Sequence, residues 1–458
     1  MAKSKNKTVF FCTNCGHEEA KWLGHCPGCG EWNSFREQKV LSESVSPAGQ
    51  IRPVSKPLSL KDIEPNPEAR RSCGIQEADQ VLGGGLVAGS SILLGGEPGI
   101  GKSTMMLQIA KESARNREVL YISGEESSGQ IKLRAERLGV DEANLIIYCE
   151  SRIEKILTVL ADRKPGIVII DSIQTMHSPT QGLVPGTVNQ LKYGCFELIN
   201  WARESGAVLF LVAHVTKEGS IAGPKVIEHL VDTVLYFDHT SGTDLRILRS
   251  TKNRFGSVDE IGIFRMEASG LKQIGNPEGL FLENREGSFP PGIAVAPVYE
   301  GSRVLLVEIQ ALTVPAKGAM SRIFSDRVES GRISRLAAIM EKHVGIRFSD
   351  QDIYINVAGG MKIAEIGIEL PLALAIYSAR TGIPLPPDLI ALGEMSLTGE
   401  IRPVSHLKRR LKAAGEMGFK RILLPGPSSE TDEWKGSAPV IASDIRESIK
   451  KVFSPEKS

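Results

Sequence analysis

The 458-residue sequence lacks the features of several specialised classes of protein. It contains no apolar run approaching the ~18–20 residues that cross a bilayer, and no apolar signal-peptide segment follows its polar N-terminus. It also lacks an excess of charge, because 55 Lys and Arg balance 54 Asp and Glu. This balance excludes a histone-like polycation, although a local basic patch can still bind nucleic acid. We therefore expect a cytoplasmic protein without membrane contact.

Cysteine is scarce as well, and its placement is informative. Four of the seven cysteines form two Cys-x-x-Cys units separated by ten residues, Cys12–Cys15 and Cys26–Cys29. Such paired units indicate metal binding and not a disulfide framework. Four thiolates around one Zn²⁺ form a closed tetrahedral site, which is structural and not catalytic. Iron, a nearby histidine ligand or a redox dithiol pair are less favoured alternatives.

The remaining sequence divides by composition. Residues 8–36 form the cysteine knuckle, and residues 37–58, rich in Ser, Pro and Val, are typical of a linker. From 59 to 275, short apolar runs alternate with helical patterns, which predicts an α/β domain with a mostly parallel sheet. A stretch rich in Gly, Pro and Asn follows at 276–292. Residues 286–453 again mix strand and helix patterns.

The apolar runs place individual elements. In the first α/β block we expect strands at 91–94, 119–122, 167–170, 208–213 and 234–237. In the second we expect strands at 293–297, 304–308, 353–357 and 421–424, and helices at 334–343, 370–380 and 406–417.

A phosphate-binding motif lies between the first of these strands and a helical pattern. The pattern G-x-x-x-x-G-K-[ST] is fulfilled by Gly96, Glu97, Pro98, Gly99, Ile100, Gly101, Lys102, Ser103 and Thr104. The glycines let backbone N–H groups approach phosphate oxygens, and the helix N-terminus adds its dipole. We expect ATP binding, with Lys102 reaching the β- and γ-phosphates and the Ser103 hydroxyl ligating Mg²⁺.

Two carboxylates follow neighbouring strands. Asp171 ends an apolar run and can hold Mg²⁺ through water, although an Asp at this place can also cap the next helix. Glu125 follows the run at 119–122 and is our first choice for the general base that polarises the attacking water. Glu126 is the second choice, since it fits a solvated helix start better.

Two further segments make this set of motifs specific. His214-Val-Thr-Lys-Glu-Gly follows the strand expected at 208–213. Lys252-Asn-Arg-Phe-Gly comes at the end of a further expected strand, 245–250. With the paired cysteines, Gly84-Gly-Leu and Gly124-Glu-Glu-Ser, they make the chain resemble the bacterial RadA (Sms) family of DNA-repair proteins from residue 9 to about 453.

The resemblance implies a RecA-like P-loop ATPase core that assembles as a homo-oligomeric, hexameric ring around single-stranded DNA. It implies a DNA-dependent ATPase and helicase that acts in homologous recombination, where ATP-driven motion processes branched DNA by branch migration. A recombinase of the RecA type is the implied protein partner.

Roles for single residues follow from the same resemblance. Lys252 and Arg254 match a Lys-x-Arg segment that crosses the subunit interface to the neighbour's γ-phosphate; contact with the DNA backbone or plain surface charge are the alternatives. His214 would sense the γ-phosphate. Lys217 and Lys225 would pair with DNA phosphates, which is a sequence-independent contact.

Residues 286–453 resemble the proteolytic domain of the Lon family, and Lys408 falls where that family has its catalytic lysine. No Ser, Thr or Cys occurs between Ser349 and Ser378, so the lysine has no nucleophile to activate. We therefore expect a Lon-protease-like α/β domain that is not proteolytic. Its basic segment, with Lys408, Arg409 and Arg410, fits either a solvated helix face or a DNA contact.

Two other functions share parts of this pattern. A KaiC-like regulatory ATPase scaffold would have a second ATPase half, but the chain has a single P-loop motif. An ATP-dependent protease would need the missing nucleophile. The DNA motor is therefore the favoured hypothesis.

Overall fold

A computed structural model describes residues 7–12, 18–28, 30–40, 59, 70–141, 144–179, 187–214, 226–239, 243–275, 279–282, 289–318, 321–431 and 434–454. The chain forms two compact units. The first contains the residues up to 238 together with 248–258 and 266–273, and the second contains 239–247, 259–265 and the residues from 274 onward. Within the described ranges, no helix has both the length and the apolarity to span a membrane.

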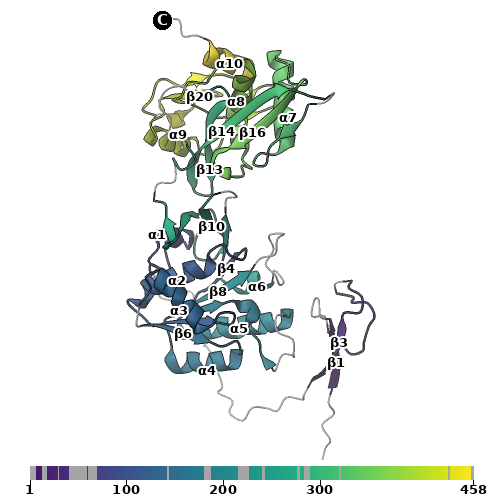
Figure 1. Ribbon diagram of the computed structural model, residues 1–458, viewed down its shortest axis with the longest axis vertical. Helices are drawn as coiled ribbons and strands as arrows, with labels where there is room; N and C mark the ends of the chain where they lie inside the picture. The colour runs from purple at the N-terminus through teal and green to yellow at the C-terminus, as the bar shows by residue number, and fades with distance from the viewer. Residues whose placement is uncertain are drawn as a thin grey trace, which may run out of the picture. The chain divides into compact units, whose positions relative to one another are not determined.

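The N-terminal ribbon is a small antiparallel sheet (Figure 1). Its strands are β1 (Lys7–Cys12), β2 (Glu18–Glu19) and β3 (Phe35–Val40), in the order β2-β1-β3. Strand β3 pairs with β1 along its whole length, so its last residues occupy the start of the predicted 37–58 linker. The buried side chains of Cys12, Cys26 and Phe35 form the core of the ribbon.

The first α/β unit is built on a nine-stranded sheet in the order β12-β11-β10-β9-β4-β8-β7-β5-β6. The strands are β4 (Ser91–Gly96), β5 (Val119–Ser123), β6 (Leu145–Cys149), β7 (Ile167–Asp171), β8 (Val208–His214), β9 (Thr233–His239), β10 (Leu245–Asn253), β11 (Ile261–Glu267) and β12 (Gly270–Gln273). The neighbours β9, β4, β8, β7, β5 and β6 run parallel to one another. All five predicted strands and the parallel sheet are confirmed.

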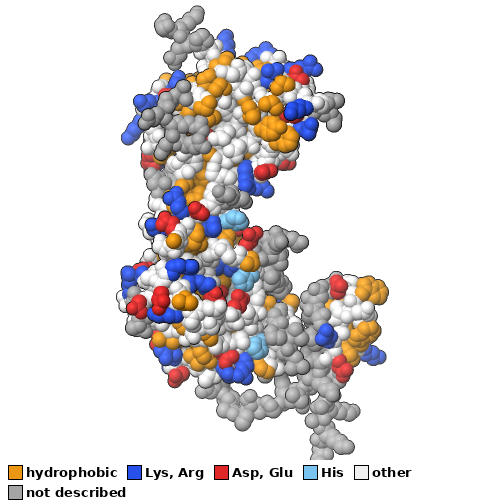
Figure 2. Space-filling view, viewed as in Figure 1, with side chains coloured by type: hydrophobic (Ala, Val, Ile, Leu, Met, Phe, Trp, Pro, Cys, Tyr) orange, Lys and Arg blue, Asp and Glu red, His pale blue; other side chains and the backbone are white. Residues whose placement is uncertain are grey.

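Helices cover both faces of this sheet (Figure 1), which is why β4, β5 and β7 are buried along their entire length. The helices are α1 (Gln76–Val81), α2 (Lys102–Ala114), α3 (Ser128–Arg137), α4 (Ile153–Arg163), α5 (Val188–Ser205) and α6 (Val226–Leu230), with a 3₁₀ turn, η2 (Ile173–Thr175). Helix α3 starts with a capping box, in which Ser127 and Gln130 satisfy each other's backbone N–H groups. On the face of the unit drawn in Figure 2, acidic and basic side chains are intermingled.

The second unit contains a seven-stranded sheet in the order β15-β16-β14-β13-β17-β20-β21. Its strands are β13 (Ile293–Glu300), β14 (Arg303–Pro315), β15 (Ile323–Phe324), β16 (Gln351–Val357), β17 (Leu389–Ala391), β20 (Arg421–Leu424) and β21 (Val440–Ile441), and a separate pair is formed by β18 (Glu394–Met395) and β19 (Ile401–Arg402). The helices are α7 (Ser330–Val344), α8 (Glu369–Thr381), α9 (Leu407–Glu416) and α10 (Ile445–Phe453), with 3₁₀ turns at Ala358–Gly360, Ile366–Ile368 and Ser429–Thr431. The predicted elements of this block are confirmed.

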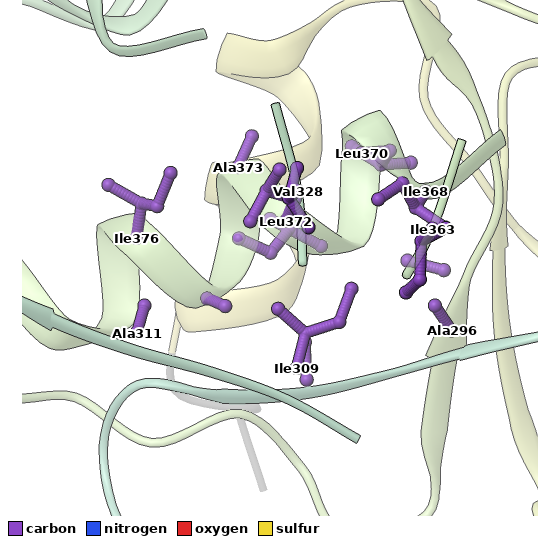
Figure 3. Packing of buried hydrophobic residues seen from close by; sticks show 14 of the residues in the cluster. Ala296, Ile309, Ala311, Val328, Ile363, Ile368, Leu370, Leu372, Ala373 and Ile376 are labelled. Atoms are coloured by element: carbon purple, nitrogen blue, oxygen red, sulfur yellow. The ribbon is translucent and has the colours of Figure 1, made fainter. Parts of the chain in front are cut away.

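The core of the second unit lies between the sheet and α8. Figure 3 shows Leu372 and Ile376 of α8 above Ile309 and Ala311 of β14. The same buried cluster contains four residues from the range predicted for the first domain: Leu245, Ile247, Ile261 and Ile263. Because their side chains are buried in this core, residues 239–247 and 259–265 belong to the second unit.

Candidate nucleotide-binding site

The P-loop connects the end of β4 to the start of α2. Gly99 and Gly101 have φ of 79° and 114°, in the left-handed region that favours glycine. A Cβ atom on Gly101 would come within 2.5 Å of the end of the Met266 side chain, so a larger residue there would require that side chain to shift. Residues 97–99 are exposed. The backbone therefore faces outward in front of the α2 N-terminus, as a phosphate cradle requires.

Lys102 lies at the base of this loop, with 4% of the residue exposed. Its ammonium donates to the carbonyls of Gly96 (2.7 Å) and Glu97 (2.9 Å). Burial lowers the pKa of Lys102, and the negative charges of Asp171 and Glu125 act against that shift. The cation is thus fixed at the carboxyl end of the sheet, beside the loop that would hold phosphates.

The two predicted carboxylates flank this lysine. Asp171 is buried at the end of β7, and the Tyr121 hydroxyl donates to its Oδ2 at 2.5 Å. Burial, and then the charge of Asp171, raise the pKa of Tyr121 well above its usual value, so the phenol remains a donor. The sequence did not point to Tyr121, because its role depends on the pairing of β5 with β7.

Glu125 is held by two neighbours. The Ser172 hydroxyl donates to its Oε1, and His214 Nε2 lies 3.4 Å from the same oxygen. The Glu125 side chain is 40% exposed, so it can still meet solvent. Glu126, in contrast, forms a two-pronged ion pair with Arg134 at 2.6 Å. This geometry favours Glu125 over Glu126 as the base.

The donor set fits Mg²⁺ bound together with a nucleotide. Mg²⁺ commonly takes one or two protein ligands, several waters and phosphate oxygens. Ser103, in the first turn of α2, and Asp171 provide such a small set. In the part of the chain that the structure describes, no three His, Cys, Asp or Glu side chains form a cluster that could hold a metal alone.

The Lys252–Arg254 segment lies at the other edge of the sheet. Arg254 donates from its backbone to the Asp232 carbonyl and from its guanidinium to the Asp232 carboxylate, both within 3.1 Å. That carboxylate also accepts from Ser91, the first residue of β4. The P-loop begins at the opposite end of the same strand, five residues or about 17 Å away. Arg254 therefore does not lie at the nucleotide site of its own chain.

Lys252 is engaged within the chain. Its ammonium donates to the carbonyls of Glu228, His229 and Val231 at 2.7–3.1 Å, which satisfies the C-terminal end of α6. Burial lowers the pKa of Lys252, and the nearby Arg254 adds to the shift. Since an ammonium has three donors, these three carbonyls use all of them.

The ribbon brings the first cysteine of each pair together. Cys12 and Cys26 are both buried in its small core, and Cys15 and Cys29 lie outside the described residues. The Cys26 carbonyl accepts from the Gly30 N–H at 2.9 Å, which closes a tight turn after Cys26. This is the arrangement that two Cys-x-x-Cys turns facing one centre require.

The predicted basic segment of the C-terminal unit needs a correction. Arg410 is 1% exposed, pairs with Glu365 and donates to the carbonyls of Ser405 and Pro297, so a DNA contact by Arg410 is wrong. The spacing in α9 explains this, because Arg410 shares the buried helix face with Leu407. Lys408 and Arg409 are exposed.

The two DNA contacts predicted in the ATPase domain, Lys217 and Lys225, lie outside the described residues.

The two serines that flank the nucleophile-free stretch of the Lon-like unit, Ser349 and Ser378, are both engaged in hydrogen bonds. Ser378 is fully buried, donates to the Ile383 carbonyl and accepts from the Gly292 N–H. Ser349 is hydrogen-bonded to Glu341. Both hydroxyls that flank the gap thus have structural partners.

Family models agree with this architecture. They match residues 10–37 (rubredoxin metal binding domain), 56–220 (AAA domain) and 326–428 (subunit ChlI of Mg-chelatase). A solved KaiC-like protein from Pyrococcus horikoshii OT3 is 19% identical, with a TM-score of 0.38, and covers 45% of this chain and 98% of that chain.

Curated relatives match almost the whole chain. The DNA repair protein RadA of Treponema pallidum (strain Nichols) is 53% identical, over 93% of this chain and 93% of the relative. The RadA proteins of Bacillus subtilis (strain 168) and Brucella abortus (strain 2308) are 41% and 43% identical, over 98% and 94% of this chain and 99% and 94% of their own lengths. With its zinc ribbon, P-loop ATPase domain and Lon-like domain, the chain belongs to the RadA family of DNA repair proteins.

Proposed function

We propose that this chain is a DNA-dependent ATPase that works as a hexameric ring motor on single-stranded and branched DNA. Its role would be branch migration during homologous recombination, with a recombinase of the RecA type as partner. The DNA repair name of its relatives and the P-loop site support this proposal.

One observation carries the proposal: Arg254 and the P-loop lie at opposite edges of one sheet. A cation placed there can reach only the nucleotide of another copy. An arginine delivered in trans stabilises the charge that develops on the transferred phosphoryl, with an effect of about 10³–10⁵ on the rate. Head-to-tail contacts of this kind close into a ring when the rotation between neighbours closes, and we propose that it does so here.

The chain's own residues would divide the work as follows. Backbone N–H groups of the P-loop bind the phosphates, and the Lys102 ammonium joins them by exchanging its bonds to the Gly96 and Glu97 carbonyls for phosphate oxygens. Mg²⁺, when bound, would neutralise phosphate charge. Glu125, held by Ser172 and beside His214, orients the attacking water and takes up its proton. Asp171 and Ser103 are the residues that would hold the metal.

The structure favours different roles for the two cations of the trans segment. The Arg254 side chain is 54% exposed and reaches outward from its Asp232 anchor. Lys252 is already bound to three carbonyls at the end of α6. We therefore assign the contact with the neighbour's γ-phosphate to Arg254, and a supporting role to Lys252.

Mixing two inactive variants tests the action in trans. Glu125→Gln keeps a working Arg254 in a dead site, and Arg254→Ala keeps a working site without the arginine. In a mixed oligomer, a site is active when it belongs to an Arg254→Ala chain and its neighbour is a Glu125→Gln chain that supplies the arginine. In an equal mixture about one site in four meets this condition, so the mixture should regain about a quarter of the wild-type ATPase rate. No recovery in demonstrably mixed oligomers would contradict the proposal.

The dependence on DNA has its own test. ATP hydrolysis by the wild type should rise when single-stranded DNA is added, and the rise should weaken with salt. Lys102→Ala should fold normally and lose turnover. A rate indifferent to DNA over a range of salt would instead favour the KaiC-like scaffold.

We also propose that the ribbon holds zinc through Cys12, Cys15, Cys26 and Cys29. Metal analysis of gently purified protein should find about one zinc per chain. The double variant Cys12→Ser/Cys26→Ser should lose it. Cys195→Ser is the matched control, since this buried cysteine lies in the ATPase unit and its loss should leave the zinc content unchanged. Iron in place of zinc, or zinc retained by the double variant, would refute the assignment.

A further inference from the structure

Gln174 joins the ends of two neighbouring strands at the nucleotide edge of the sheet. It lies in η2, three residues after the end of β7. Its side-chain amide accepts from the His214 backbone N–H at 3.2 Å and donates to the His214 carbonyl at 3.0 Å. His214 is the last residue of β8, so the amide holds the strand where it ends.

The strand pairing explains why such a clamp is needed. Strand β7 pairs with β8 as far as Asp171, which is opposite Val212. Beyond this point β7 no longer pairs with β8, and no strand among the described residues pairs with His214 on that side of β8. The Gln174 amide supplies one donor and one acceptor there, and so replaces the missing step of the ladder.

The clamped residue holds two groups of the nucleotide site. His214 Nδ1 lies 3.3 Å from the Lys102 ammonium, and Nε2 lies 3.4 Å from Glu125 Oε1. An ammonium can only donate, so Nδ1 acts as the acceptor and the ring proton is on Nε2, toward Glu125. The position of the His214 backbone therefore sets how the imidazole bridges the lysine and the base.

We propose that Gln174 is a positioning residue for ATP hydrolysis, which fixes the His214 imidazole between Lys102 and Glu125. Its amide contacts the His214 backbone, so we expect it to act on the orientation of the base and not on nucleotide affinity. The inference deepens the proposed function, because the segment that begins after His214 contains Lys217, a proposed DNA contact.

The test compares Gln174→Met with Gln108→Met. Gln108 of α2 makes the same two bonds, to the backbone N–H and carbonyl of Leu271, both at 3.0 Å, and is half-buried like Gln174. Thermal unfolding, nucleotide Kd and kcat are measured for both variants. We expect similar small losses of stability, unchanged Kd for both, and a kcat lowered roughly ten- to hundred-fold in Gln174→Met alone, since small misplacements at such sites cost about 10²-fold.

Equal kcat values for the two variants would overturn the proposal, and so would a Gln174→Met effect confined to Kd. Gln174→Glu is the second variant, because it keeps the acceptor and loses the donor; we expect an intermediate kcat, and a wild-type kcat would equally refute the clamp. These readouts need no DNA. If the wild type shows no stimulation by DNA while the kcat pattern holds, the motor proposal fails and the positioning role stands.

Discussion

Each unit contains one lysine that belongs to a family motif, and the surroundings of the two lysines differ. They are Lys102 in the ATPase unit and Lys408 in the C-terminal unit. Lys102 is buried among backbone carbonyls, beside the buried Asp171 and the Glu125 side chain, which is 40% exposed. Lys408 is exposed, and the buried cation of its helix is Arg410, which is bound to Glu365 and two carbonyls.

The difference teaches how to separate functional charge from structural charge. At the nucleotide edge, the polar groups hold one another yet leave carboxylate oxygens and backbone N–H groups for a ligand. Under α9, the buried guanidinium has its donors paired inside the protein, and the stretch between Ser349 and Ser378 offers Lys408 no Ser, Thr or Cys to activate. A motif lysine therefore indicates chemistry only when its neighbours can complete the reaction.

The largest expected effect concerns the two adjacent glutamates. Glu125→Gln should lower kcat by about 10²–10⁴, because an amide cannot take up the proton of the attacking water. Glu126→Gln should change kcat little, because that carboxylate is paired with Arg134. ATP hydrolysis at saturating nucleotide, with Kd measured separately, distinguishes them. Equal losses in both variants would remove the distinction that the geometry makes.

The next effect concerns stability in the other unit. Arg410→Met should destabilise the C-terminal unit by about 3–5 kcal/mol, because it leaves Glu365 without its buried partner. Arg409→Met, one position earlier and exposed, should cost less than about 1 kcal/mol. Denaturant unfolding measures both. Adding Glu365→Gln should recover part of the loss, since no unpaired charge then remains; no recovery would mean that packing, not charge, dominates.

The sequence was a good guide to the fold because the buried strands of both sheets are continuous apolar runs. It did not predict β6, an edge strand whose residues are only half-buried or exposed, or β17, which has only three residues. Short or edge strands bury too little surface to leave a clear pattern. The sequence also predicts the ATPase domain for residues 245–247 of β10 and 261–265 of β11, which belong to the second unit. Nothing in their sequence shows which of the two cores they join.

For the site, the sequence pointed to the residues that motifs contain and missed those that act through geometry. Lys102, Asp171 and Glu125 come together because parallel strands end at the same edge of a sheet. Tyr121 and Gln174 carry no motif, and their contacts depend on which strands are neighbours. Arg410 was misread, although its spacing from Leu407 already placed it on the apolar face of its helix.

The smallest effect would come from the exposed cations of α9. If Lys408 and Arg409 touch phosphates of single-stranded DNA, Lys408→Ala/Arg409→Ala should weaken DNA binding equally for all sequences. The salt slope of log K should fall by up to about 1.4, since each phosphate contact on a single strand contributes about 0.7. Arg409 also donates to the Tyr299 hydroxyl at 2.9 Å, so part of this cation is already in use, and a slope change nearer that of a single contact is expected. Titrations of labelled DNA at several salt concentrations measure it. Lys412→Ala, on the same helix and 70% exposed, is the control for a solvated cation, and equal slopes in both variants would leave α9 outside the DNA interface.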